Sequence, residues 1–177
     1  GKGGLVAAFN HKNVGDKLID ISGNGYNGLT GTQPYPMLTT KGWKFTGNEY
    51  QRITSITAKL NADSGTFTIA GIIKYNGGSG RNYIWNSAAL GGDRISLTVE
   101  GTLRFSWYDG AVTTAVSSNN NLVVGEAVTY VVTANSGTLK MYINGVEQTG
   151  TTASSLGSGN FCFGAHASAF NDNFHGE

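Results

Sequence analysis

The sequence is poor in charge and in cysteine, and each shortage excludes a class of protein. Only 13% of its 177 residues are charged, and 12 Lys and Arg nearly balance 11 Asp and Glu. Because the basic residues are scattered singly, no stripe is available for the phosphates of nucleic acid. No apolar run approaches the roughly 18 residues of a membrane-spanning segment, so we expect no membrane insertion. The single cysteine, Cys162, excludes an internal disulfide framework.

Glycine and uncharged polar residues take the place of the missing charge. Aromatic and β-branched residues are spread along the whole chain, so we expect a folded chain and not a disordered one. The length suits one domain, residues 1–177. A surface that is polar but uncharged favours an extracellular, cell-surface or virion-surface location.

Apolar residues alternate at period two, and glycine interrupts the pattern every 8–12 residues or so. This pattern predicts an all-β fold with almost no helix, a two-sheet antiparallel β-sandwich of about twelve strands. The first strand is expected at residues 4–10, and the one helical candidate is residues 55–61.

Glycine and asparagine predict the places where the strands turn. Asn144-Gly145 is the strongest signal for a two-residue hairpin, and Gly71 within a strand indicates a bulge or a close contact. Gly47-Asn48 is expected to pair strand 43–45 with strand 51–54, and 117–121 is expected to be a loop.

Gly23, Gly25 and Gly28 have the spacing of a dinucleotide-binding loop, but a helix would have to start at the third glycine. The segment from Leu29 to Pro36 contains two prolines and a further glycine, so it cannot form that helix. What remains is a tight polar loop that carries the carboxylate of Asp20.

Six short motifs occur along the chain: Gly4-Leu-Val-Ala-Ala-Phe9, Asp20-x-Ser-Gly-Asn-Gly-x-x-Gly28, Trp43-x-Phe-x-Gly47, Phe67-Thr-Ile-Ala-Gly-Ile-Ile-Lys74, Leu139-Lys-Met-Tyr-Ile-Asn-Gly145 and Phe174-x-Gly176. In this order they resemble the laminin G-like, concanavalin A-like jelly roll over essentially the whole chain. In that family a further strand with an aspartate follows the last motif. The resemblance therefore implies that this domain lacks its C-terminal strand and belongs to a larger protein, or that another chain supplies the strand.

The resemblance also implies a structural calcium ion. Asp20 would be a ligand, Asn24 and Asn27 would contribute backbone or side-chain oxygens, and Asp172 could replace the later aspartate. The alternative is that Asp20 and Ser22 only close the turn through hydrogen bonds to backbone amides.

Aromatic side chains are the candidates for binding a sugar, because a sugar presents flat faces of C–H groups to a ring. The candidate ligand-binding residues are Tyr83, Trp85, Tyr108 and Tyr142. Alternation places Tyr108 and Tyr142 on outer faces. Plain cross-strand packing is the alternative role for each of these rings.

We expect no catalytic residues. Retaining glycosidases need two carboxylates about 5 Å apart, whereas Glu49, Glu100, Glu126 and Glu147 stand singly, mostly at turns. His166, Asp172 and His175 match no familiar metal spacing. Cys162 lies between two phenylalanines, which argues against a reactive thiolate.

The sequence therefore predicts a non-catalytic, calcium-supported module that recognises glycans through loops at one rim of the sandwich, including 76–82, 117–121 and 149–159. The parent would be an extracellular or virion-surface protein with a role in adhesion. The alternative is a structural or display domain of a phage or cell-surface assembly, with neighbouring proteins as its partners.

Overall fold

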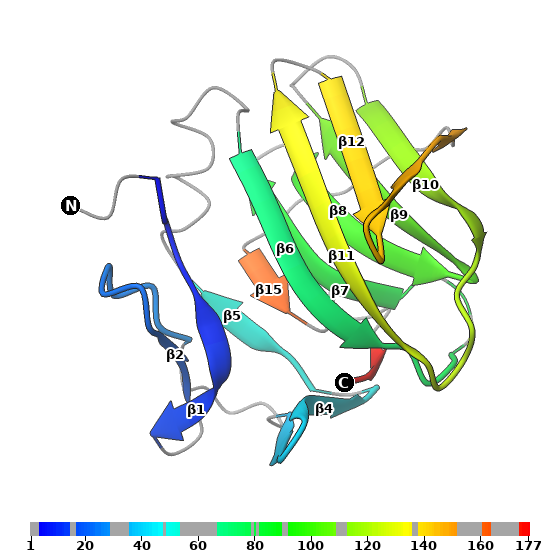
Figure 1. Ribbon diagram of the computed structural model, residues 1–177. Helices are drawn as coiled ribbons and strands as arrows, with labels where there is room; N and C mark the ends of the chain where they lie inside the picture. Colours follow the sequence, from blue (N-terminus) through cyan, green and yellow to red (C-terminus); the bar gives the residue numbers. More distant parts are fainter. Residues whose placement is uncertain are drawn as a thin grey trace.

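Strands are the only regular elements among the described residues of a computed structural model of this chain (Figure 1). The structure describes residues 4–14, 17–28, 36–47, 49–53, 67–78, 80, 82–89, 92–108, 113–135, 138–151, 161–163 and 174–177. Every strand pairing in these ranges is antiparallel, which confirms the all-β prediction. The helical candidate 55–61 lies outside them. The described ranges contain no helix long and apolar enough to cross a membrane.

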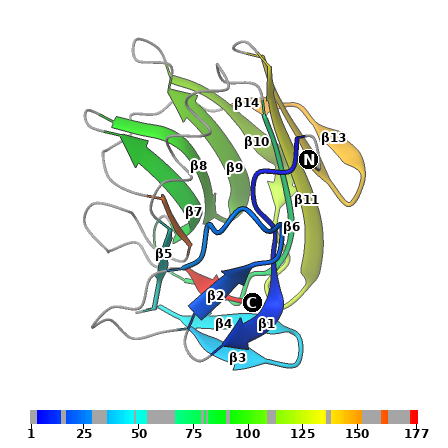
Figure 2. The same ribbon diagram turned by 90° about the vertical axis from the view of Figure 1, so that its left-hand side faces the viewer.

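Two sheets face each other and form the body of the protein (Figure 2). The larger has seven strands, in the order β14 (Gly150–Thr151), β10 (Thr113–Asn121), β9 (Thr102–Tyr108), β8 (Gly92–Glu100), β7 (Asn82–Ala89), β15 (Phe161–Phe163) and β5 (Gln51–Ile53). The smaller has four strands, in the order β13 (Val146–Gln148), β12 (Thr138–Ile143), β11 (Ala127–Asn135) and β6 (Phe67–Lys74). Two small ribbons accompany them, β1 (Phe9–Val14) with β2 (Lys17–Asp20), and β16 (His175–Gly176), β4 (Gly42–Thr46) and β3 (Met37–Thr39).

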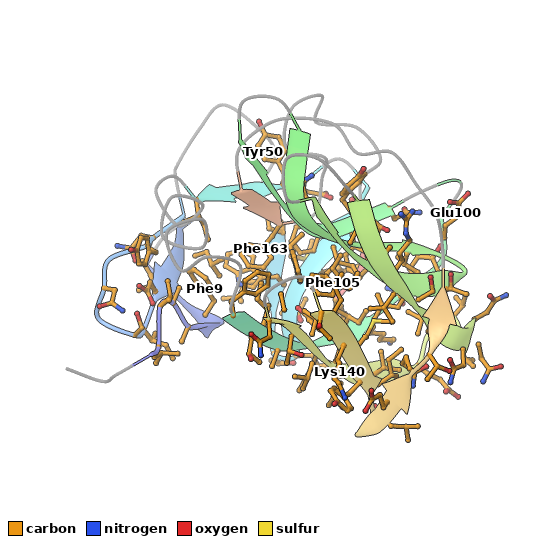
Figure 3. The ribbon with its side chains drawn as sticks, turned by 90° about the horizontal axis from the view of Figure 1, so that it is seen from above. Phe9, Tyr50, Glu100, Phe105, Lys140 and Phe163 are labelled. Atoms are coloured by element: carbon orange, nitrogen blue, oxygen red, sulfur yellow. The ribbon has the colours of Figure 1, made fainter. Side chains whose placement is uncertain are left out.

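The core lies between the two sheets and follows the predicted alternation. Leu97 and Val99 of β8 and Phe105 of β9 are fully buried on the inner face of the larger sheet. Val132 of β11 and Met141 of β12 are fully buried on the inner face of the smaller sheet. In Figure 3 the labelled side chains of Phe9, Phe105 and Phe163 gather in the same space, and the rings of Phe9 and Phe163 meet edge to face at 5.7 Å.

A hydrogen bond crosses this core. Nε1 of Trp85 on β7 donates to the hydroxyl of Tyr130 on β11 at 3.0 Å. Burial raises the pKa of Tyr130 to about 12, although the bond from Trp85 opposes that rise, so the hydroxyl stays protonated near neutral pH. Tyr130 lies directly opposite Gly71 of β6, where a Cβ would come within 2.6 Å of the hydroxyl oxygen. The close contact predicted at Gly71 is therefore confirmed.

The chain passes from the smaller sheet to the larger one between β13 and β14. At this crossing the Oδ1 of Asn119 on β10 accepts hydrogen bonds from the backbone N–H groups of Thr149 and Gly150. The backbone N–H of Asn119 in turn donates to the side-chain oxygen of Gln148. One asparagine thus joins the two sheets at the edge of the sandwich.

The Asn144-Gly145 hairpin is confirmed, since both residues have positive φ (50° and 82°) and join the paired strands β12 and β13. Three other local expectations are wrong. The first strand begins at Phe9, not at residue 4. Residues 117–121 belong to β10, because the hydroxyl of Ser118 accepts the backbone N–H of Leu103 and holds this polar run in the sheet.

The third wrong expectation is the pairing of β4 with β5. β4 pairs with β3 through a shorter connection, and β5 joins β15 in the larger sheet. After β4, the carboxylate of Glu49 accepts hydrogen bonds from the backbone N–H and the hydroxyl of Thr46, the last residue of that strand. A strand beyond β16 stays a prediction. Glu177 exchanges two backbone hydrogen bonds with Lys74 at the end of β6.

Tyr130→Phe removes the hydroxyl that accepts the buried N–H of Trp85, and we expect it to lower the free energy of unfolding by about 1–3 kcal/mol. Tyr142→Phe removes a hydroxyl from the outer face of the same sheet and should cost less than about 0.5 kcal/mol. Chemical denaturation of both variants checks this. Equal losses would contradict a special role for the bond between the sheets.

Candidate functional site

The loop after β2 is organised by the carboxylate of Asp20, which is 7% exposed. Its Oδ1 accepts the backbone N–H groups of Ala8 at 3.0 Å and Ser22 at 2.8 Å, and its Oδ2 accepts that of Tyr26 at 3.0 Å. The side chain of Asn27 accepts the backbone N–H of Asp20 itself. The structure therefore brings together the residues that the sequence singled out.

Burial alone would raise the pKa of Asp20, but hydrogen bonds outweigh it. The bonds come from the Ser22 side chain and from the backbone N–H groups of Ala8, Ser22 and Tyr26, and the pKa is lowered. The carboxylate is thus held in its charged form by the turn that it closes.

The same loop holds the N-terminal segment in place. Nδ2 of Asn24 donates to the backbone carbonyls of Leu5 at 2.8 Å and Val6 at 2.9 Å, and the hydroxyl of Ser22 also donates to Val6. Together with the bond from Ala8 to Asp20, these contacts attach residues 5–8 to the loop.

The three predicted calcium ligands fit the ion in chemistry, because they carry carboxylate and amide oxygens. In number they fall short of the six to eight oxygens or so that calcium takes, so carbonyls or water would have to complete the shell. Asp20 and Asn27 also direct oxygens at backbone N–H groups. No group of three His, Cys, Asp or Glu side chains suited to a metal occurs in the described part of the chain. Asp172 lies outside it, and calcium stays a prediction.

The four predicted ligand-binding aromatics do not form one site. Trp85 is fully buried in the core, so its assignment as a sugar-binding ring is wrong. Tyr83 lies two residues earlier, yet it is not part of the core cluster. The pairing of β7 with β8 shifts between these residues, which moves them to opposite faces of the sheet. Tyr83 is also buried, so it presents no ring face to solvent. The side chain of Tyr108 lies outside the described part.

Tyr142 lies on the outer face of the smaller sheet, as predicted, and is partly exposed. It pairs with Val131 of β11 on one side and with Glu147 of β13 on the other. Nζ of Lys140 lies 3.0 Å from Oε1 of Glu147, and both side chains are nearly half exposed. Figure 3 shows Lys140 on the outer side of these strands.

The contacts among Tyr142, Lys140 and Glu147 shift the pKa values of the two charged side chains. The hydrogen bond and charge of Glu147, with a smaller contribution from Tyr142, raise the pKa of Lys140. The hydrogen bond from Lys140 is the main cause that lowers the pKa of Glu147. We call Lys140, Tyr142 and Glu147 the Tyr142 cluster. It offers a ring, a donor and an acceptor side by side on an accessible surface.

A second polar surface, which the sequence analysis missed, covers the outer face of the larger sheet. Backbone pairing sets Tyr83, Thr98, Arg104 and Ser117 in one row across four strands. Ser106 of β9 is buried on the same face. The signal was present in the sequence, because these polar residues alternate with the inward apolar ones. Tyr83, Thr98, Ser106 and Ser117 are all buried. Within the described part of the chain, the accessible candidate is therefore the Tyr142 cluster.

Comparisons with known proteins agree with this fold. A family model described as Laminin_G_3, concanavalin A-like lectin/glucanases superfamily, matches residues 45–177. Among solved structures, the Trypanosoma rangeli sialidase in complex with sialic acid is similar, with a TM-score of 0.66 and 14% identity over 99% of this chain. The same sialidase with the inhibitor DANA gives a TM-score of 0.65 and 12% identity over 94% of this chain. The chain spans 29% and 28% of those two sialidase chains. These identities show similarity of fold alone. No curated protein matches the chain.

Asp20→Asn should flatten the acid limb of the stability profile. Because the folded-state pKa of Asp20 is lowered, its contribution is present above the unfolded value of about 3.9 and is lost as pH falls through the folded pKa. We expect the variant to lose about 1–3 kcal/mol at neutral pH and less below pH ~4. Urea titration across pH measures this, with the exposed Glu126→Gln as control. Parallel profiles for Asp20→Asn and the wild type would contradict the assignment.

The calcium prediction has its own test. Calcium at 100 times its dissociation constant should stabilise the wild type by about 2.7 kcal/mol. Asp20→Asn should remove most of this effect. Thermal unfolding with calcium and with a chelator measures both, and identical midpoints for the wild type would overturn the prediction.

Proposed function

We propose that this chain, which belongs to the concanavalin A-like lectin/glucanase superfamily, is a carbohydrate-binding module that acts without catalysis. The observation that carries the proposal is the Tyr142 cluster. A sugar that stacks its C–H face on Tyr142 has the Lys140 ammonium as a donor and the Glu147 carboxylate as an acceptor for its hydroxyl groups.

The surroundings of the cluster suit a polar, uncharged ligand. Thr133 lies opposite Lys140 on β11, and Val131 lies opposite Tyr142, so a hydroxyl and a small apolar surface flank the ring. Alternate side chains of each strand lie on the same face of the sheet, so these residues form one continuous surface. We therefore propose this sheet face as the binding surface, in place of the rim loops that the sequence analysis favoured.

The absence of catalysis is part of the proposal. Among the described side chains, the contacts seen for three carboxylates go to groups other than carboxylates: Asp20 binds backbone amides, Glu49 binds Thr46 and Glu147 binds Lys140. Glycoside hydrolysis needs two cooperating carboxyl groups. A binding module is consistent with this dispersion, and the low charge of the chain supports a place on a cell or virion surface.

A second candidate function is a structural domain that contacts neighbouring proteins of a surface assembly. It is favoured by exposed aliphatic side chains near one end of the smaller sheet, where Ile72 is 71% exposed and Val124 and Val146 are also exposed. Ile72 pairs with Thr129, whose backbone N–H donates to the side chain of Asn144 in the β12–β13 turn.

Tyr142→Ala should weaken glycan binding at least about fivefold, because a ring contact is worth about 1 kcal/mol. Tyr142→Phe keeps the ring and should retain most of the affinity. A glycan array followed by titration calorimetry measures both variants beside the wild type. Absence of binding to every glycan would remove this proposal and leave the assembly role. Equal loss in both variants would show that stacking is not the contact.

A further inference from the structure

The outer face of the smaller sheet has little net charge. The alternate positions that face outward on β6 hold Thr68, Ala70 and Ile72, and those on β11 hold Thr129, Val131 and Thr133. Among the described residues of this face, charge occurs in the Tyr142 cluster and at Lys74. Lys74 ends β6 and lies four residue pairs beyond the row that contains Tyr142.

Among the described side chains, Glu147 neutralises the cation that lies beside the ring. Lys140 and Glu147 come from adjacent strands of a tight hairpin, and their charged atoms are 3.0 Å apart. Glu147 lies directly opposite Tyr142, so its carboxylate is next to any ring stacked there. The hairpin holds Lys140 and Glu147 close together. An incoming anion must therefore compete for Lys140 with a carboxylate that the fold already keeps beside it.

From this geometry we infer that Glu147 is a specificity-determining residue that makes the Tyr142 cluster a site for neutral sugars and disfavours acidic ones. The inference rests on the proposed function. A neutral sugar uses the ion pair as it stands, because the ammonium and the carboxylate both keep hydrogen-bonding capacity for hydroxyl groups.

Among the described side chains of this face, an acidic sugar gains no new charge partner beside Tyr142. If its carboxylate takes Lys140, then Glu147 loses its cationic partner and keeps only the hydrogen bond from Tyr142 beside a second carboxylate at close range. If the ion pair stays intact, the sugar carboxylate meets Glu147 without a free cation. Like charges about 4 Å apart in water repel enough to lower affinity about fivefold, and less exposure to solvent would strengthen the repulsion and lower affinity further.

The test compares lactose with sialyllactose, a neutral sugar and its acidic derivative, or the best neutral glycan from the array with its sialylated form. The readout is the ratio of acidic to neutral affinity, measured by calorimetry at low and at physiological salt. Glu147→Gln keeps the shape of the side chain and releases Lys140. We expect the ratio to rise at least about fivefold, and the gain to shrink as salt is added.

Two further variants make the outcome specific. Glu147→Gln combined with Lys140→Gln removes the carboxylate and the released cation together, so the ratio should fall below that of Glu147→Gln and stay at or above that of the wild type. Glu126→Gln removes an exposed carboxylate outside the cluster and should leave the ratio unchanged, which controls for net charge. Circular dichroism and thermal unfolding confirm that each variant is folded.

The outcomes separate the two proposals. If the wild type binds no neutral glycan, the proposed function fails and this inference fails with it. If the wild type binds neutral glycans but Glu147→Gln leaves the ratio unchanged, the inference alone is overturned. The same holds if Glu126→Gln raises the ratio as much as Glu147→Gln does, because the effect would then belong to net charge.

Discussion

The hydrogen bond between Trp85 and Tyr130 fixes how the two sheets face each other, because it is a directional contact among the apolar side chains of the core. Hydrophobic contact holds the layers together but tolerates sliding, whereas a buried N–H must reach one acceptor. Gly71 makes the arrangement possible, since any side chain there would occupy the space of the Tyr130 ring. Together with the hydrogen bonds of Asn119 at the edge of the sandwich, this contact fixes the two layers relative to each other.

The local part of the fold could be predicted because its signals are local. Period-two alternation predicted strands with one apolar face, as β8 and β9 have, and Asn144-Gly145 predicted a turn whose two residues both need positive φ. Partner choice could not be predicted in the same way. Residues 117–121 have the composition of a loop, but Ser118 bonds to a residue 15 positions away and Asn119 to one 30 positions away. Such contacts exist only once the sheets have formed.

The candidate site shows the same difference between local signals, which could be predicted, and strand pairing, which could not. The Asp20 loop could be predicted as a cluster, because its residues are neighbours in sequence and its turn geometry is local. Tyr142 was placed on an outer face by alternation, which holds throughout β12. Trp85 and Tyr83 show where this reasoning fails, since one shift in the β7–β8 register reverses the faces of residues two positions apart. A sequence alone does not reveal such a shift.

The alternation of β12 places the residues that pack the core and the residues that face a ligand on opposite sides of one strand. Met141 points inward and is fully buried, while Lys140 and Tyr142 on either side of it point outward. Mutations in the outward set change what the surface meets without altering the volume of the interior. Selection can therefore diversify this surface while the scaffold stays constant, which makes the β12–β13 hairpin a natural starting point for directed evolution of new specificities.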